Sequence, residues 1–184
     1  MVDEGELLER CRAGDQHGFA ELFNRYRVRA FRLAYAIAGD RVLADDATQE
    51  AFIQAFRALH NIRPGAAFAP WFFAIVTNRA RKITMRRRWW LPIASAEAVP
   101  DVRAADALDS AEYSQVWEAV KRLPVDLRAV IALRYALDMS EAEMTSILKV
   151  PAGTVKSRLH RARELLRSEF RMDWKEDRRH GRLR

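Results

Sequence analysis

The chain has 184 residues, of which 49% are hydrophobic and 31% charged, and its formal net charge is +7. This composition indicates a folded, soluble protein rather than a disordered one, and the basic balance favours a polyanionic partner, either nucleic acid or an anionic membrane surface. Cys11 is the single cysteine, so no intrachain disulfide is possible. No run of apolar residues approaches the roughly 18 that a membrane span needs, and the acidic N-terminus does not resemble a signal peptide.

The charge is unevenly distributed along the chain. Residues 1–88 hold 15 basic and 10 acidic residues, and residues 111–184 hold 16 and 11. Between them, residues 89–110 hold 1 basic and 4 acidic residues. Two basic blocks flanking an acidic connector favour two modules that face nucleic acid, joined by a linker.

Four helices are predicted in the N-terminal half. Residues 3–38 form two of them, interrupted at Gly14-Asp15, and Gly39 stands where a glycine commonly ends a helix. A third helix covers about 43–59, and a fourth begins near Pro70, a residue tolerated in a first helical turn. The apolar faces of these helices include several aromatic residues, namely Phe19, Phe23, Phe52 and Phe56.

The C-terminal half begins after a stretch of poor periodicity over 91–108, which we interpret as a linker. Ser140 and Glu143 have the spacing of a capping box and predict the start of a short helix. A tight turn follows at 149–150, and a longer basic helix runs over about 151–170. This order of elements is typical of a helix-turn-helix.

The long basic helix is amphipathic. At about 100° per residue, Val155, Leu159, Ala162 and Leu166 share one face. The opposite face carries Lys156, Ser157, His160, Arg161, Glu164 and Arg167, with Arg158 at the border. Lys, Ser, His and Arg side chains can donate hydrogen bonds to base edges and phosphates in a major groove. A solvated helix with no DNA role is the alternative interpretation of the pattern alone.

The stretch from Leu123 to Arg167 closely resembles region 4 of the extracytoplasmic-function (ECF) sigma factors, which belong to the sigma-70 family of bacterial RNA polymerase. The resemblance rests on Leu123-Pro124 with Arg128 and Leu133-Arg134-Tyr135, and on Gly153-Thr-Val-Lys-Ser-Arg-Leu159 with Arg161-Ala-Arg163. It implies that this module binds duplex DNA at the −35 element and packs on the β flap of the polymerase. The implied base-edge contacts are Lys156, Ser157, His160 and Arg161, and the implied phosphate contacts are Thr154 and Arg158.

Residues 5–88 resemble region 2 of the same family. Asp45, Asp46, Gln49 and Glu50 form one polar strip, because they are spaced at i, i+1, i+4 and i+5 of a helix. The strip could be a solvated face, but the resemblance implies that it binds the β′ clamp helices of core RNA polymerase.

The second half of this region resembles the part of the family that melts the −10 element and holds a flipped base. An unstacked base needs an apolar wall and a polar partner, and neighbouring cations can hold the phosphates. The implied contacts to single-stranded −10 DNA are Pro64, Gly65, Phe68, Asn78, Arg79, Arg81, Lys82 and Arg86. We expect Trp71 to be a core anchor rather than a stacking platform, and Cys11 to be plainly buried.

Two positions depart from the family pattern in region 4. Glycine is usual where Asp138 stands and common where Lys149 stands. Because glycine adopts positive φ at little cost and lysine does not, we expect the geometry of these turns to be affected.

The resemblance implies an all-α protein of two small domains joined by a flexible linker. Region 2 covers 1–90, the linker 91–110, region 4 covers 111–175, and a frayed basic tail covers 176–184.

Such a protein is a cytoplasmic, nucleoid-associated transcription initiation factor under the control of an anti-sigma factor, without membrane insertion, metal or cofactor. No catalytic constellation stands out in the sequence, so any catalysis is expected to belong to the polymerase. Two alternatives stay open, a stand-alone helix-turn-helix regulator and a helical adaptor or inhibitor with incidental basicity.

Overall fold

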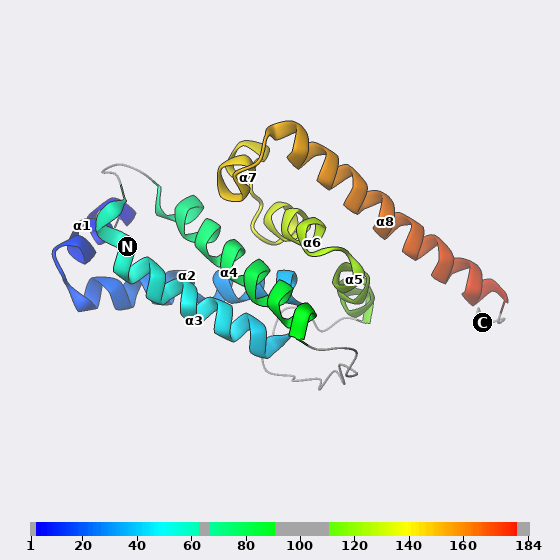
Figure 1. Ribbon diagram of the computed structural model, residues 1–184, viewed down its shortest axis with the longest axis horizontal. Helices are drawn as coiled ribbons and strands as arrows, with labels where there is room; N and C mark the ends of the chain where they lie inside the picture. The colour runs from blue at the N-terminus through cyan, green and yellow to red at the C-terminus, as the bar shows by residue number, and fades with distance from the viewer. Residues whose placement is uncertain (1–2, 63–66, 91–110, 180–184) are drawn as a thin grey trace.

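Figure 1 presents the computed structural model of the protein, which describes residues 3–62, 67–90 and 111–179. Within these ranges every regular element is a helix, which confirms the predicted all-α class. The N-terminal elements are α1 (Glu4–Arg12), α2 (Gln16–Ala38), α3 (Arg41–Ala58), the short 3₁₀ turn η1 (Leu59–Asn61) and α4 (Phe68–Trp90). The C-terminal elements are α5 (Ala111–Arg122), α6 (Val125–Ile131), the π-helical turn η3 (Ala132–Ala136), α7 (Glu141–Leu148) and α8 (Ala152–Arg179).

Aspartate side chains mark the starts of the first three helices. Asp15 accepts a hydrogen bond from the backbone N–H of His17 at 2.9 Å, and Asp40 accepts one from Leu43 at 3.0 Å. Each bond satisfies a donor that a helix start leaves without an intrahelical partner. At the other end of α2, Gly39 takes the left-handed conformation with φ 72°, as the sequence predicted.

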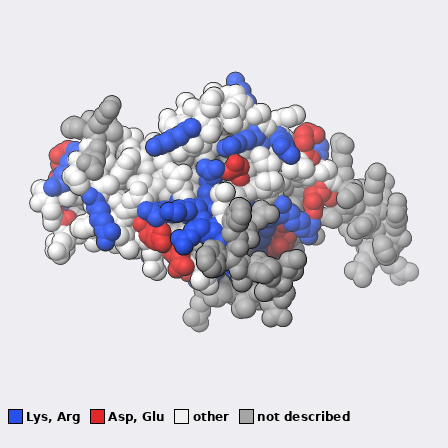
Figure 2. Space-filling view, in the orientation of Figure 1, with Lys and Arg blue, Asp and Glu red and all other residues white. Residues whose placement is uncertain are grey.

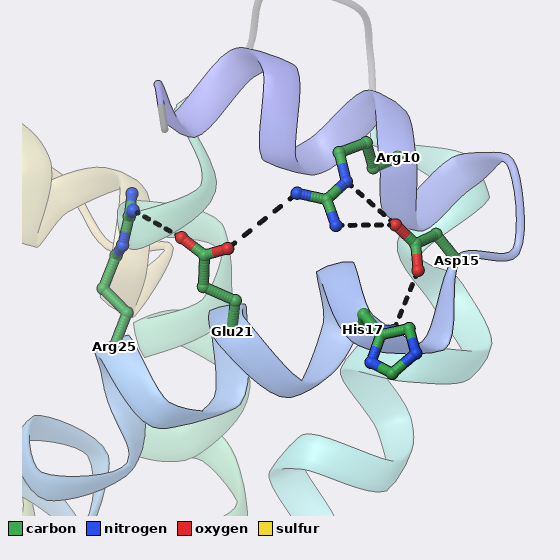
Figure 3. Close-up of polar contacts among 5 residues, drawn as sticks. All are labelled: Arg10, Asp15, His17, Glu21 and Arg25. Atoms are coloured by element: carbon green, nitrogen blue, oxygen red, sulfur yellow. Dashed lines mark hydrogen bonds and ion pairs between the residues drawn. The ribbon is translucent and has the colours of Figure 1, made fainter. Parts of the chain in front are cut away.

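A network of charged side chains joins α1 to α2, as Figure 3 shows. Arg10 donates from Nε to Asp15 at 2.8 Å and lies 3.9 Å from Glu21, which in turn pairs with Arg25 at 3.4 Å. The hydrogen bond from Arg10 lowers the pKa of Asp15 below its ordinary value. The first two helices are therefore held together at their turn by ionic contacts.

The core of the N-terminal half lies between α2, α3 and α4 and is rich in aromatic rings. Phe52, Phe68, Phe72 and Phe73 are buried, and the Tyr26 ring packs edge-on against the last three at 5.0–5.9 Å. Burial of each such side chain contributes about 1.5–3 kcal/mol to folding. Helix α4 begins at Phe68, so that Pro70 lies within its first turn as expected.

The C-terminal half contains the predicted helix-turn-helix, formed by α7 and α8. The capping box is confirmed, because Ser140 Oγ accepts from the Glu143 N–H at 3.3 Å and the Glu143 carboxylate accepts from the Ser140 N–H at 2.8 Å. The hydrogen bonds from Ser140 lower the pKa of Glu143. Helix α8 continues to Arg179, beyond the predicted end, and includes the first residues of the expected tail.

Both residues that stand where the family usually has glycine adopt a positive φ. Asp138 has φ 52° and Lys149 has φ 54°, and these are the two non-glycine residues with positive φ in the described part of the chain. The left-handed conformation costs an L-residue other than Asn or Asp about 1–2 kcal/mol, so Lys149 ends α7 at an energetic cost. Both residues thus keep the positive φ that suits glycine, and the expected change in turn geometry stays a prediction.

The two halves of the protein pack against each other. Helix α4 lies beside α6 and α7, and α2 lies beside α5 and α6 (Figure 1). The Trp117 ring meets the Tyr35 ring edge-on at 6.2 Å, and a Cβ at Gly39 would lie 2.9 Å from Nη1 of Arg128. We call this contact between the halves the domain interface. Glycine is favoured at 39 for its positive φ, and a larger residue would also displace the end of the Arg128 side chain.

Candidate nucleic-acid and partner-binding surfaces

The acidic strip on α3 faces solvent along its whole length. Asp45, Asp46, Gln49 and Glu50 are all exposed, while the opposite face of α3, with Ala47, Ala51 and Ala55, is buried. The strip is thus a continuous polar surface with three carboxylates. It can accept several hydrogen bonds from a basic partner.

An exposed aromatic cluster lies next to the strip and was not predicted. Phe23 and Phe56 belong to the predicted apolar faces of their helices, but their side chains are 39% and 59% exposed. Phe56 lies edge-on to Phe19 at 4.7 Å, and Ile53 on the same helix is also exposed. Packing of α2 against α3 therefore leaves part of these apolar faces open to solvent. Contiguous exposed apolar side chains beside charged ones are typical of a protein-binding surface.

The residues assigned to the −10 element are found in different environments. Pro64 and Gly65 lie outside the described residues. The Phe68 ring is fully buried against Tyr26 and Phe72, so it is part of the core. Trp71 is half-buried and packs on Phe68 at 5.7 Å, in line with its expected anchoring role.

One face of α4 presents polar side chains to solvent. Asn78, Lys82 and Arg86 recur every four residues and are all exposed, which places them about 6 Å apart along the helix. This face lies roughly opposite the buried residues Phe73 and Ala80. An amide followed by two cations can contact a base edge and the adjoining phosphates of a single strand.

Two other arginines of α4 are engaged with carboxylates. Arg79 donates to Gln54 at 2.9 Å and to Glu50 at 3.1 Å, which links α4 to the end of the acidic strip. Arg81 donates to Asp126 of α6 at 2.5 Å, across the domain interface. Phosphate binding by either cation would compete with these partners.

The start of α8 presents the predicted −35 contacts. Lys156, Ser157, His160 and Arg161 are exposed, whereas Val155, Leu159 and Ala162 are buried in the core. Lys156 lies 3.7 Å from Glu141 of α7, a weak surface ion pair. A Cβ at Gly153 would meet no atom within 4 Å, so the helix start is open on this side.

The two predicted phosphate contacts of α8 are less accessible. Thr154 is half-buried, and its backbone N–H donates to the Pro151 carbonyl at 2.9 Å. Arg158 is also half-buried, and its Nη2 lies 3.2 Å from Asp126. Asp126 therefore binds Arg81 of the N-terminal half and Arg158 of the recognition helix at the same time, which the sequence did not indicate.

The surface of the molecule carries its basic side chains in groups. Figure 2 shows Lys and Arg gathered over the middle of the visible face, with a few acidic side chains among them. Several of these cations form ion pairs with carboxylates. The electrostatic potential that attracts a polyanion such as DNA therefore depends on which of these ion pairs open when it binds.

The described residues also bear on metal binding, thiol reactivity and membrane spanning. No group of three His, Cys, Asp or Glu side chains among them could hold a metal ion. The half-buried Cys11 packs against the core, and burial raises the pKa of its thiol, which disfavours the reactive thiolate. No helix of the described part has the length and apolarity needed to cross a bilayer.

Two protein families match the sequence. Residues 22–91 match the family described as Sigma-70 region 2, and residues 113–166 match Sigma-70, region 4. The first match contains α3 and α4, and the second contains the helix-turn-helix.

Characterised relatives match over most of the chain. It is 32% identical over 177 residues to the ECF RNA polymerase sigma factor SigW of Bacillus subtilis, covering 89% of this chain and 95% of that protein. It is 34% identical over 175 residues to the ECF RNA polymerase sigma-E factor of Escherichia coli K12, covering 87% and 90%.

Solved structures share the fold at lower identity. CnrH in complex with the cytosolic domain of CnrY superposes with a TM-score of 0.71 and 24% identity, over 92% of this chain and 98% of that chain. The sigma factor RpoE in complex with the anti-sigma factor NepR from Bartonella quintana gives 0.66 and 24%, over 84% and 98%.

Proposed function

This chain belongs to the ECF sigma factors of the sigma-70 family, and from that premise we propose that it binds core RNA polymerase, recognises −35 and −10 promoter elements, melts the −10 element and directs initiation. Bond formation in the transcript belongs to the polymerase. The protein supplies binding surfaces, and its site of action is the bacterial nucleoid in the cytoplasm.

The observation that carries the proposal is the exposed face at the start of α8. Lys156, Ser157, His160 and Arg161 project from one side of a helix whose other side is buried against α6 and α7. Such a helix can enter the major groove of duplex −35 DNA, where Arg161 and Lys156 are suited to guanine edges. Thr154 and Arg158 contribute phosphate contacts once Arg158 has left Asp126.

The −10 element is assigned to the outer face of α4. Asn78 supplies a polar partner for an extruded base, and Lys82 and Arg86 hold the phosphates of the melted strand. The segment with Pro64 and Gly65 completes the site. Phe68 does not stack on the base, because its ring is buried in the core.

We assign the binding of core polymerase to the outer face of α3. The acidic strip provides charge for a basic partner such as the β′ clamp helices, and exposed Phe56 and Ile53 add apolar area that an interface would bury. Contact with the β flap of the polymerase is assigned to region 4. The combination of a charged strip with aromatic anchors favours a polymerase subunit over a small ligand as the occupant.

An anti-sigma factor is a further proposed partner. Two structures with this fold were solved as complexes, RpoE with the anti-sigma factor NepR and CnrH with the cytosolic domain of CnrY. An inhibitor of this kind would cover the polymerase-binding or DNA-binding faces described above.

The test is abortive initiation by bacterial core polymerase on a library of duplex promoters, with and without the protein. We expect selective initiation, and we expect Asn78→Ala and Arg161→Ala to reduce it by about tenfold or more without loss of core binding. Matched controls are Asn24→Ala on the exposed surface of α2 and Arg167→Ala farther along α8.

A stand-alone DNA-binding regulator predicts a different outcome. Such a protein would bind duplex DNA tightly by itself and never direct initiation, even when the chain is cut between 91 and 110 to separate the two halves. That result would replace the sigma proposal.

A further inference from the structure

Three threonines are buried in the described part of the chain, and one of them differs from the other two. Thr48 and Thr84 each donate their hydroxyl to the carbonyl oxygen four residues earlier, at 2.7 and 2.6 Å. Thr77, in the middle of α4, is 0% exposed, and its Oγ1 has no hydrogen-bond partner among the described residues. Such a group destabilises the folded state, because it has given up its hydrogen bonds to water and gained none in return.

A second polar atom on the same side of α4 is in a similar situation. Arg81 follows Thr77 by about one helical turn, so the two side chains lie next to each other on the helix surface. The Nη2 atom of Arg81 pairs with Asp126 of α6, but its Nε is buried and lacks a hydrogen-bond partner within the described ranges. Two neighbouring donors of α4 are thus left unsatisfied while the two halves of the protein pack together.

The C-terminal half covers this side of α4. Helix α4 lies beside α6 and α7 (Figure 1), and the ion pair between Arg81 and Asp126 shows which side of α4 is turned toward α6. Asp126 is 40% exposed, so solvent screens this ion pair. Separation of the two halves would therefore uncover the side of α4 that carries Thr77 and Arg81.

The covered side of α4 borders the exposed face that we assign to the −10 element. Asn78 and Lys82 are exposed, and each follows one residue after Thr77 or Arg81, at about 100° around the helix. The four side chains occupy positions i, i+1, i+4 and i+5 and form one polar strip that is two residues wide. Half of this strip faces solvent, and the other half lies under the C-terminal half of the protein.

We propose that Thr77 and Arg81 are a covered extension of the −10 surface: once region 4 has moved off α4, the Thr77 hydroxyl and the Arg81 guanidinium donate to backbone phosphates of the melted strand. This inference rests on the proposed −10 function. Phosphate oxygens accept the hydrogen bonds that both donors lack in the packed arrangement, and they suit a guanidinium well. These contacts hold the strand in the place where Asn78 meets a base. Single-stranded DNA and region 4 therefore compete for one side of α4.

The experiment compares Thr77→Val with the wild type, each assembled with core polymerase, in binding to a single-stranded oligonucleotide with the −10 element found by the promoter library. Valine resembles threonine in shape but lacks the hydroxyl. We expect the affinity to fall by about threefold to tenfold, and by the same factor when one base is changed, because a phosphate contact carries no sequence information. Thr77→Ser should keep the wild-type affinity. Thr84→Val is the matched control, since the hydroxyl of Thr84 is already bonded within α4.

Stability and salt dependence give two further readouts. Because the Thr77 hydroxyl is unsatisfied in the packed arrangement, Thr77→Val should keep or raise the midpoint of thermal unfolding of the free protein. Arg81→Met should make the slope of log affinity against log salt concentration shallower by about 0.7, the value for one phosphate contact of a single strand. Thr77→Val should leave this slope unchanged, because the hydroxyl is neutral.

The covering of Thr77 is tested by maleimide labelling of Thr77→Cys in a Cys11→Ser background, which should be faster in the holoenzyme than in the free protein. Equally slow labelling in both would overturn the proposal. A Thr77→Val protein that is less stable than the wild type, or a folded one with unchanged affinity for the oligonucleotide, would overturn it as well. A wild-type holoenzyme that fails to distinguish the −10 oligonucleotide from the one with a changed base would instead overturn the proposed −10 function, and this inference with it.

Discussion

The substitution Asp126→Asn tests how the two halves of the protein are held together. Asp126 of α6 accepts from Arg81 of α4 and Arg158 of α8, and asparagine keeps its shape but removes its charge. Of the two ion pairs, the one with Arg81 crosses the domain interface. We therefore expect the substitution to weaken packing of the halves without unfolding either of them.

The magnitude follows from the exposure of the three side chains. Asp126 is 40% exposed, and Arg81 and Arg158 are 25% and 24% exposed, so solvent screens both pairs substantially. Partly exposed pairs contribute about 0.2–1 kcal/mol each, and we take the upper end because both oxygens of Asp126 are engaged, one by each arginine. A loss of about 1 kcal/mol at the interface corresponds to about a fivefold increase in the equilibrium constant for separation of the halves.

Single-molecule fluorescence energy transfer between dyes on α3 and α8 measures this equilibrium, in a background where Cys11 is replaced by serine. Asp138→Asn is the control, because Asp138 is an exposed carboxylate of the same half and asparagine tolerates its positive φ. Added salt should separate the two halves of the wild type more than those of Asp126→Asn. Salt screens the ion pair of Asp126 with Arg81, and this pair is already absent in the variant. Promoter affinity should rise by a similar factor, because Arg81 and Arg158 no longer have to leave a carboxylate to bind phosphate.

The reasoning is refuted if Asp126→Asn matches the wild type in both energy transfer and salt dependence. It is also refuted if the effects of Asp126→Asn and Arg81→Met are additive. Two partners of one ion pair should give a double variant that differs little from either single one.

Three further outcomes are expected. Lys149→Gly should raise the free energy of unfolding by about 0.5–1 kcal/mol in urea titrations by relieving the positive φ, whereas Lys149→Ala should leave it nearly unchanged. Burial raises the pKa of Asp40, but hydrogen bonds from the Leu43 N–H and from Arg87 outweigh this and lower it overall. The stability contributed by ionised Asp40 is thus present above pH 3.8 and is lost as the pH falls through the lower pKa that Asp40 has in the folded protein. We therefore expect Asp40→Asn to have a lower free energy of unfolding than the wild type at neutral pH, and the difference to vanish in acid. A difference that stays constant across this pH range would contradict the assignment. Phe56→Ser should weaken binding to core polymerase by about tenfold in fluorescence anisotropy titrations with little change in thermal stability, and an unchanged affinity would remove Phe56 from the polymerase surface.

Much of the local structure could be predicted from the sequence because it depends on neighbours in the chain. The Ser140–Glu143 capping box, the glycine at 39 and the two faces of α8 involve residues one to eleven positions apart. The acidic strip was predicted on the same grounds, since i, i+1, i+4 and i+5 positions of a helix share a side whatever surrounds it. The family resemblance extended these local patterns to a function.

The tertiary structure decided which predicted side chains are accessible and which are paired. Helical periodicity placed Phe56 on an apolar face, and the family resemblance assigned Phe68 to the −10 DNA. Packing of α2, α3 and α4 instead buries Phe68 fully and leaves Phe56 59% exposed. Arg81 and Arg158 were both predicted to face DNA, and they meet on Asp126 only because α4, α6 and α8 come together in space.

The long-range contacts of α1 have the same origin. Glu4 and Arg12 are ordinary charged residues of a short surface helix in the sequence, and their partners, the N–H of Phe68 and the carbonyl oxygen of Ile62, lie 64 and 50 residues away. Periodicity encodes which face of a helix is apolar, but not which distant backbone group lies opposite a given side chain. The sequence therefore determined the helices, their caps and the faces that carry charge, while packing between helices determined which of those charges are available to a partner.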